Sequence, residues 1–420
     1  MHSSNCQPLA AAAVVAALAG FAGSAQASGT LETLYSFCSS SGCPDGDQPY
    51  AGVTLESSGR LLGTTGFGGK YSGGTVFALD DRHGSWTLKS LKSFCVGKPP
   101  NCQSDQGPSV TLVVDTSGNI YGTAYFAGAG NDGAVFELES KGGNKYALHY
   151  IHTFAGSDGA GPWDISYAGQ NTGAPYDGKS PLYGATIAGG TAGNGTVYSL
   201  TPGNGGWNFQ TLYNFCGCSD GGLPRGAVLV GASGALYGTT GYYGNNSAGT
   251  IYELTQSGGI WSETTLYEFC GQANCADGNG PFAGLAQDTS GNLYGTTYFG
   301  GNAGDGVVFE FSSTSQYSVL YSFCAQTNCT DGSEPAAPVT LDSKGDIFGT
   351  AGRGGDGNFG AMFEIKRGAY ARLYSFCALS GCSDGGYPYG ALALDSKGRL
   401  YGTTQYGGAR GLGSVYRLKP

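Results

Sequence analysis

The chain has 420 residues and a formal net charge of −10 at pH 7, with 78 glycines and only 12% charged residues. Average proteins contain roughly 7% glycine, and an excess without a collagen period indicates many tight turns. The acidic balance excludes charge-based recognition of nucleic acid, because a phosphate backbone requires a basic surface. The 12% aromatic content favours an all-β protein.

Residues 1–27 have the features of a secretory signal peptide. An apolar core at 10–21 is followed by a small-residue cleavage site at Ala25-Gln26-Ala27, although the segment before the core has no Lys or Arg. The apolar core is too short for a membrane-spanning helix. We therefore expect residues 28–420 to form a secreted or periplasmic protein without a membrane span, and a monomer.

A pentapeptide, LYGTT, organises the remaining sequence. Each copy follows an apolar strand (such as 390–394) and a tight turn, and precedes a glycine-rich loop, a third strand (249–254) and a fourth strand (265–269). Four short strands in each of seven units predict an all-β fold, a single seven-bladed β-propeller domain with four antiparallel strands per blade. The seven copies lie at 61–65, 120–124, 182–186, 236–240, 293–297, 347–351 and 400–404.

The two ends of the repeat region complement each other. The region begins with a fourth-type strand at 31–37, and its last unit ends after a third-type strand at 413–418. We expect the N-terminal strand to complete the last blade, which removes the open sheet edge. A solenoid is the alternative, but it would have no use for this permutation.

The repeat pattern, an apolar strand, D-S-x-G-x-L-Y-G-T-T, GG, G-T-V-F-x-L and L-Y-x-F, resembles the GloVer tandem-repeat family of secreted bacterial proteins over residues 31–420. It is also similar to propeller repeats of the NHL type. This resemblance implies a fold but no particular chemistry.

Twelve of the 13 cysteines form six sequence pairs, each just after a fourth strand. In an exported protein we expect one local disulfide per pair, each contributing about 2 kcal/mol. Metal binding is the alternative, but it needs four converging ligands and the blades keep the pairs apart. Free thiols are a second possibility for Cys216 and Cys218, because a single residue separates them. The pairs are Cys38–Cys43, Cys95–Cys102, Cys270–Cys275, Cys324–Cys329, Cys377–Cys382 and Cys216–Cys218.

Each of these loops, and the equivalent loop of unit three, ends in an Asp-Gly motif followed by proline, which Asp105 carries in a shortened form. Calcium binding is one interpretation of seven equivalent acids. We favour a structural role in which each Asp forms an Asx-turn with its own backbone. The other six are Asp45, Asp158, Asp220, Asp277, Asp331 and Asp384.

Two rings of residues are predicted on the propeller face that carries the cysteine loops and the GG loops. Aromatic rings suit stacking on sugars, and arginine suits a carboxylate; packing against the loops is the alternative, which we favour for the second ring. The first ring follows the loop proline and contains Tyr50, Ser109, Trp163, Arg225, Phe282, Ala336 and Tyr389. The second lies two residues past TT and contains Phe67, Phe126, Ala188, Tyr242, Phe299, Arg353 and Tyr406.

Unit three departs most from the repeat. It lacks cysteines, carries Trp163-Asp164 where other units have small residues, and has an eight-residue insertion within 167–180. We expect Trp163, Asp164 and the neighbouring Arg225 to form the functional corner. His149 and His152 lie three apart in a strand and so point to opposite faces, which argues against a shared metal ion.

The sequence has no HExxH motif and no strand–turn–helix context for a GxSxG or phosphate-loop motif, and we expect no cofactor and no metal site. The favoured function is an exported module that binds a glycan or another extracellular polymer. Its predicted ligand-binding residues are Trp163, Arg225, Tyr50, Phe282, Tyr389 and Arg353. One alternative is a polysaccharide lyase or hydrolase with Asp164, Tyr167 or a ring tyrosine as acid or base and Arg225 holding a uronate. The other is a structural or protein-interaction scaffold.

Overall fold

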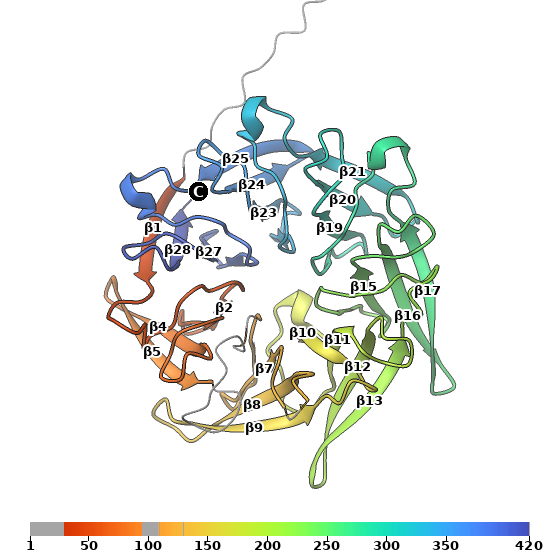
Figure 1. Ribbon diagram of the computed structural model, residues 1–420, viewed down its shortest axis with the longest axis horizontal. Helices are drawn as coiled ribbons and strands as arrows, with labels where there is room; N and C mark the ends of the chain where they lie inside the picture. Colours follow the sequence, from red (N-terminus) through yellow and green to blue (C-terminus); the bar gives the residue numbers. More distant parts are fainter. Residues whose placement is uncertain (1–28, 95–107, 109, 129, 420) are drawn as a thin grey trace, which may run out of the picture.

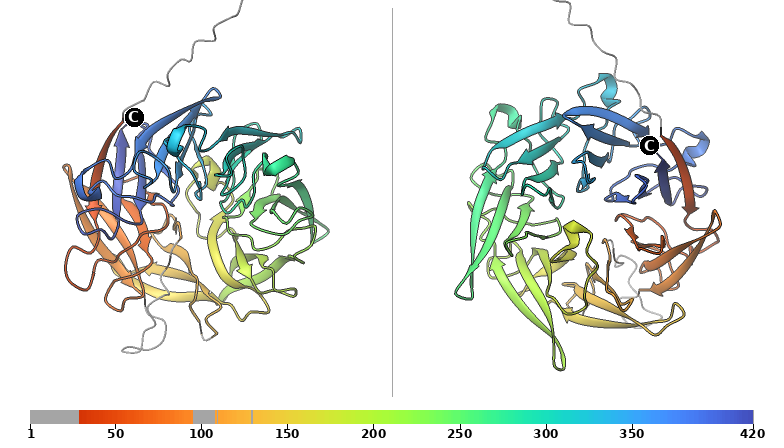
Figure 2. Two further views of the ribbon diagram at one scale, coloured as in Figure 1. Left: turned by 45° about the horizontal axis from the view of Figure 1, so that its top comes forward. Right: turned by 180° about the vertical axis from the view of Figure 1, so that it is seen from behind.

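A computed structural model describes residues 29–94, 108, 110–128 and 130–419, so the predicted signal peptide lies outside the described residues. Seven four-stranded antiparallel sheets follow one another around a central axis (Figure 1). The view from behind in Figure 2 shows the same closed ring. The seven-bladed propeller predicted from the repeats is confirmed. Within the described residues, no helix is long and apolar enough to cross a membrane.

The blades are numbered in chain order, and the first strand of each lies nearest the axis. Blades 1 to 3 contain β2 (Thr54–Leu55), β3 (Leu61–Thr65), β4 (Thr75–Arg82), β5 (Ser85–Ser93), β6 (Val113–Val114), β7 (Ile120–Ala124), β8 (Ala134–Ser140), β9 (Tyr146–Thr153), β10 (Ala160–Tyr167), β11 (Leu182–Ala188), β12 (Thr196–Gly203) and β13 (Gly206–Asn214). Blades 4 to 6 contain β14 (Leu229–Val230), β15 (Leu236–Thr240), β16 (Thr250–Ser257), β17 (Ile260–Glu268), β18 (Ala286–Gln287), β19 (Leu293–Thr297), β20 (Val307–Phe311), β21 (Tyr317–Ser322), β22 (Thr340–Leu341), β23 (Ile347–Ala351), β24 (Ala361–Lys366) and β25 (Ala369–Ser375). Blade 7 contains β26 (Ala393–Leu394), β27 (Leu400–Thr404), β28 (Ser414–Lys419) and β1 (Thr30–Ser36). Four short 3-10 turns, η1 (Gln170–Thr172), η2 (Ala273–Cys275), η3 (Thr327–Cys329) and η4 (Ser380–Cys382), lie in the loops.

The LYGTT segment forms the second strand of each blade, and its residues have separate packing roles. In β15, the Thr239 hydroxyl donates to the carbonyl of Ala283 in the next blade at 2.8 Å, and Thr240 pairs with Thr250 of the third strand at 2.9 Å. The glycine leaves room for the ring of Tyr252, with which a Cβ at Gly238 would collide. The repeated pentapeptide therefore joins strands within a blade and joins one blade to the next.

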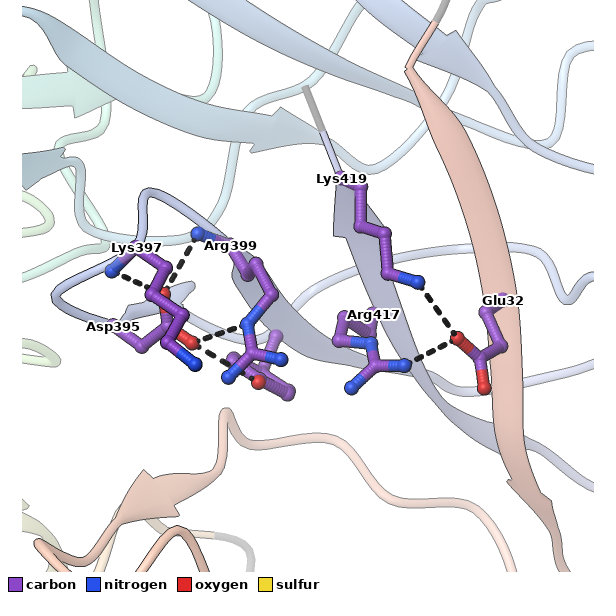
Figure 3. A network of polar contacts seen from close by, with 7 residues as sticks. Glu32, Asp395, Lys397, Arg399, Arg417 and Lys419 are labelled. Carbon is purple, nitrogen blue, oxygen red and sulfur yellow. Dashed lines mark hydrogen bonds and ion pairs between the residues drawn. The ribbon is translucent and has the colours of Figure 1, made fainter. Parts of the chain in front are cut away.

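The N-terminal strand closes the ring, as the sequence predicts. β1 pairs antiparallel with β28, with Leu31 opposite Leu418. Glu32 accepts a 2.5 Å contact from Arg417 and lies 3.8 Å from Lys419 across this pair (Figure 3). Just after β1, Phe37 is fully buried. The closure therefore combines a strand ladder, ion pairs and a buried aromatic side chain.

The cysteine loops and the GG loops lie on one face of the propeller, because they hydrogen-bond to each other. The amide of Gly301 donates to the carbonyl of Cys275 at 2.9 Å, and Gly244 donates to Cys218 at 2.8 Å. Within the described residues, the local disulfides are confirmed, whereas the pair Cys95–Cys102 lies outside them. Those formed are Cys38–Cys43, Cys216–Cys218, Cys270–Cys275, Cys324–Cys329 and Cys377–Cys382.

The loop aspartates within the described residues support their loops, but their partners differ from the Asx-turn with their own backbone that we predicted. Asp277 is fully buried and reaches back to accept hydrogen bonds from the amides of Gly271 and Gln272 at 2.9 and 3.2 Å. The Tyr267 hydroxyl donates to it at 2.7 Å. The tyrosine of the L-Y-x-F strand is thus a partner that the sequence analysis did not predict, and in Asp277 these contacts occupy both carboxylate oxygens.

Replacing Asp277 by alanine is expected to lower the free energy of unfolding by about 1–3 kcal/mol, because it leaves two loop amides and a half-buried tyrosine hydroxyl without an acceptor. Urea denaturation of the Asp277→Ala variant measures this loss. Asp356→Ala is the control, since that carboxylate is exposed and, within the described residues, bonds only Arg372. Equal stability of the two variants would contradict the structural role.

Candidate functional site

A cavity of about 550 Å³ lies at the mouth of the central channel, between the inner ends of the blades. The first ring predicted from the sequence supplies much of its wall, and Ser109 is the member that lies outside the described residues. The structure thus brings residues from six blades to one place. The first-ring residues that line the cavity are Tyr50, Trp163, Arg225, Phe282, Ala336 and Tyr389.

The second ring divides into two groups. Phe67 and Phe126 line the cavity, whereas Arg353 does not. Arg353 forms an ion pair with Glu334 at 2.9 Å, and Glu334 also accepts a hydrogen bond from the Tyr298 hydroxyl at 2.5 Å. The other described aromatic members are exposed on the same face around the cavity. They are Tyr242, Phe299 and Tyr406, whose exposed fractions are 38%, 44% and 40%.

A third set of lining residues was not predicted. Tyr125 and Tyr298 directly follow the second strands of their blades and line the cavity. The equivalent position is glycine in blade 4, where a Cβ at Gly241 would lie 2.8 Å from the Phe282 ring of the next blade. Tyr298, by contrast, faces a blade whose first-ring residue is Ala336. This size relation does not hold for Tyr125, because that tyrosine packs against Trp163 of the next blade.

A β-bulge places Trp163 and Asp164 together at the cavity. The register of β10 with β11 shifts between Pro162 and Ile165, so two residues lie where a regular ladder has one. Such bulges re-aim side chains. β10 is also eight residues long, whereas the inner strand of every other blade has two (Figure 1). Asp164 and Trp163 both line the cavity, and the Trp163 ring packs edge-on against Tyr125 at 6.1 Å.

The Asp164 carboxylate is half-buried beside blade 2. Its Oδ1 accepts a hydrogen bond from the amide of Thr111 at 2.7 Å. Burial raises the pKa of Asp164 to about 6, and the Thr111 amide offsets only part of that effect. A group with this pKa can gain or lose a proton near neutral pH.

Arg225 is the cation of the cavity. Its guanidinium lies over the rings of Phe282 and Tyr242, at 4.8 and 5.7 Å from their centroids. Within the described residues it forms no ion pair, and its buried Nε has no hydrogen-bond partner. Because a buried guanidinium N–H normally has an acceptor, this arginine is available to an anionic ligand. Arg353, by contrast, forms an ion pair, and its Nε lies 2.9 Å from a carboxylate oxygen of Glu334.

The cavity tyrosines are neutral hydrogen-bonding groups. Burial raises the pKa values of Tyr50, Tyr298 and Tyr389, and for Tyr298 the adjacent Glu334 carboxylate adds to the effect. The Tyr50 hydroxyl donates to Gln48 Oε1 at 2.9 Å. These hydroxyls therefore stay protonated at neutral pH and suit contacts with the hydroxyl groups of a ligand.

The sequence of residues 110–420 identifies the family to which this propeller belongs. The Gloeobacter/Verrucomicrobia repeat matches residues 110–329 and 267–420, well over half of the chain. The chain belongs to the Gloeobacter/Verrucomicrobia repeat family. This confirms the resemblance stated from the repeat pattern. No curated protein sequence matches this Gloeobacter/Verrucomicrobia repeat protein.

Solved structures share its fold at low sequence identity. A putative 6-phosphogluconolactonase from Bacteroides uniformis is 17% identical with a TM-score of 0.51, covering 82% of this chain and 88% of the other. A putative oxidoreductase (glucose dehydrogenase) from Thermus thermophilus is 16% identical with a TM-score of 0.43, covering 74% and 96%. A sialidase from Trypanosoma rangeli is 12% identical with a TM-score of 0.42, covering 80% and 56%. The likeness to the putative 6-phosphogluconolactonase, with a TM-score above 0.5, shows the propeller fold alone.

The two predicted acid–base candidates do not converge in this Gloeobacter/Verrucomicrobia repeat protein. Asp164 lines the mouth cavity. Tyr167 lines a second cavity of about 350 Å³, which is formed largely by residues of the inner strands. The Tyr167 hydroxyl donates to the carbonyl of Ala174 in the insertion at 2.6 Å. Tyr167 lies three residues after Asp164 on β10, so this one strand reaches both cavities.

The histidines of β9 have separate partners. His149 lies 3.0 Å from Glu139 on the outer surface, and His152 lies 3.0 Å from the loop carboxylate Asp158. His152 occupies the position that tyrosine fills in the blades with an L-Y-x-F strand. The register of β9 with β8 shifts between the two histidines, so the regular alternation that predicted opposite faces does not hold there.

Proposed function

We propose that this protein is an exported module that binds the end of an acidic glycan, or of a related carboxylated polymer, in the mouth cavity. The observation that carries the proposal is Arg225, a cation without an ion-pair partner among the described residues, held against aromatic rings in an open cavity. Arginine binds carboxylates through paired hydrogen bonds. The local disulfides support export, because such bonds persist in oxidising compartments.

The aromatic walls support a carbohydrate ligand. Trp163, Phe282 and Tyr389 present rings from three blades, and aromatic rings stack on the apolar faces of sugars. The cavity volume is within the range of about 300–1,000 Å³ that small-ligand sites occupy. The protonated tyrosine hydroxyls provide neutral partners for sugar hydroxyls. An acidic oligosaccharide would enter from the loop face and place its terminal sugar against Arg225.

The experiment is a carbohydrate array of uronate and sialylated oligosaccharides, each printed beside its carboxyl-reduced form. We expect at least one acidic oligosaccharide to bind, and its reduced form to bind about tenfold more weakly or worse. Equal binding of both forms would contradict the role of the carboxylate. Absence of binding to every acidic oligosaccharide would overturn the glycan proposal and favour a scaffold.

The affinity for a carboxylated oligosaccharide is expected to rise about fivefold as pH falls from about 7.5 to about 5. The pKa of Asp164 is about 6, so the carboxylate repels the ligand above this value and is neutral below it. The carboxylate of the ligand, with a pKa near 4 or lower, stays ionised throughout. Calorimetric titration at several pH values measures the trend. The Asp164→Asn variant should lose it, and a retained trend in that variant would assign it to another group.

A second function, cleavage of the bound polysaccharide, rests on the same carboxyl group. A pKa of about 6 suits a general acid or base at neutral pH. Hydrolysis by the common route needs two carboxyl groups, and Asp164 is the only one among the described residues that line the cavity. Binding alone is therefore favoured. Chromatography of any array ligand after incubation with the protein decides between the two, since cleavage must yield shorter products that Asp164→Asn does not form.

A further inference from the structure

We propose that the Cys216–Cys218 disulfide is a thiol–disulfide exchange site that oxidises exposed dithiols. It follows β13 on the loop face, at the junction of blades 3 and 4. Both cysteines are exposed, whereas the eight cysteines of the other four described disulfides are buried or half-buried. Access to an attacking thiolate is the first requirement for exchange. This disulfide meets it.

The covalent loop closed by the Cys216–Cys218 disulfide is smaller than the loop closed by any other described disulfide. A single residue, Gly217, separates its two cysteines, whereas each of the other four described pairs has a sequence separation of five. Cross-linking residues so near in sequence removes little entropy from the reduced chain. A disulfide with little chain-entropy stabilisation and good exposure belongs to the reactive class and not to the structural class.

The shortened loop also moves the loop aspartate onto the sulfur atoms. Asp220 follows Cys216 by four residues, whereas Asp277 follows Cys270 by seven. As a result, Asp220 Oδ1 lies 2.8 Å from Cys216 Sγ and 3.6 Å from Cys218 Sγ. A thiol can donate a hydrogen bond to this oxygen, and a disulfide cannot. The buried carboxylate therefore stabilises the reduced form and makes the disulfide a better oxidant.

The loop backbone is held independently of the sulfur–sulfur bond. The amide of Gly244 donates to the carbonyl of Cys218 at 2.8 Å, and the side chain of Asn194 donates to the carbonyl of Cys216 at 2.9 Å. The amide of Cys216 donates to Asp220 Oδ2 at 2.9 Å. Opening the disulfide leaves these bonds in place, so the two thiols stay adjacent and can close again.

The exchange balances without another cofactor. A substrate thiolate attacks one Sγ, the disulfide bond breaks, and the other Sγ leaves as a thiolate that takes a proton from water. The second substrate thiol, after losing its proton, attacks the mixed disulfide. The substrate loses two electrons and becomes a disulfide, and Cys216 and Cys218 become thiols. Glutathione disulfide, through the reverse sequence, restores the starting state.

The test equilibrates the protein with glutathione buffers of increasing reducing strength, traps free thiols by alkylation and identifies them by peptide mass spectrometry. We expect the equilibrium constant for reduction of Cys216–Cys218 to exceed that of each other described disulfide by about tenfold or more. Reduction of this pair together with the others, or after them, would overturn the proposal.

Activity is tested with a peptide that carries two reduced cysteines. The wild-type protein should oxidise about one equivalent of peptide, and the Cys216→Ser/Cys218→Ser variant should not. The matched control, Cys270→Ser/Cys275→Ser, removes a half-buried disulfide of the neighbouring loop and should leave the oxidation unchanged. Equal peptide oxidation by both double variants would assign it to another disulfide and contradict the proposal.

Discussion

The Arg225→Ala variant is expected to bind a carboxylated oligosaccharide about 30-fold more weakly than the wild-type protein, a loss of about 2 kcal/mol. Arg225 has no ion-pair partner among the described residues and lies over Phe282 at 4.8 Å, so its removal leaves the ligand carboxylate without a cation. Isothermal titration calorimetry measures the loss. Because the guanidinium supports no other part of the described structure through an ion pair, we expect the variant to keep its fold.

Arg353→Ala provides the matched control. Arg353 occupies the second ring and is bound to Glu334 at 2.9 Å, outside the cavity lining. It was also predicted to bind ligand, and its observed position implies a small effect on affinity, about twofold or less. An equal loss in both variants, or none in Arg225→Ala, would contradict the assignment of the carboxylate to Arg225.

The Phe37→Ala variant is expected to lose about 3–5 kcal/mol of stability, because it leaves a large cavity at the closure of the ring. Phe37 is fully buried and packs edge-on against Phe77 of blade 1 at 5.1 Å. It thereby joins the last blade to the first. Chemical denaturation measures the loss.

Thr30→Ala is the control for the closing strand, since Thr30 is exposed at its start. This control should change the free energy of unfolding by about 0.5 kcal/mol or less. If Phe37→Ala were as stable as Thr30→Ala, the N-terminal strand would not close the propeller in the way described.

The fold was predictable because short repeated segments determine how each blade packs. In LYGTT, Thr239 and Thr240 bond to a neighbouring blade and a neighbouring strand, so their recurrence specifies both contacts. The unpaired strand types at the two chain ends predicted the pairing of Leu31 with Leu418. The first ring could be located because it follows the loop proline at a constant distance from the second strand.

Three features of the site were not predictable from strand periodicity. The bulge between Pro162 and Ile165 changes which way Asp164 points, and a sequence pattern of period two does not reveal such a shift. Tyr167 lies at a different cavity from Asp164. The lining role of Tyr298 depends on the size of Ala336 in the next blade, and contacts between blades have no fixed sequence separation.

The most direct test of the proposed site uses Trp163 as its own reporter. A variant with Trp86→Phe, Trp207→Phe and Trp261→Phe keeps one tryptophan, at the cavity wall. Titration with a carboxylated oligosaccharide identified on the array should change the fluorescence of Trp163 in a saturable way, with the same dissociation constant as calorimetry gives. Calorimetric binding with no change in Trp163 fluorescence would place the ligand elsewhere and contradict the cavity as the binding site.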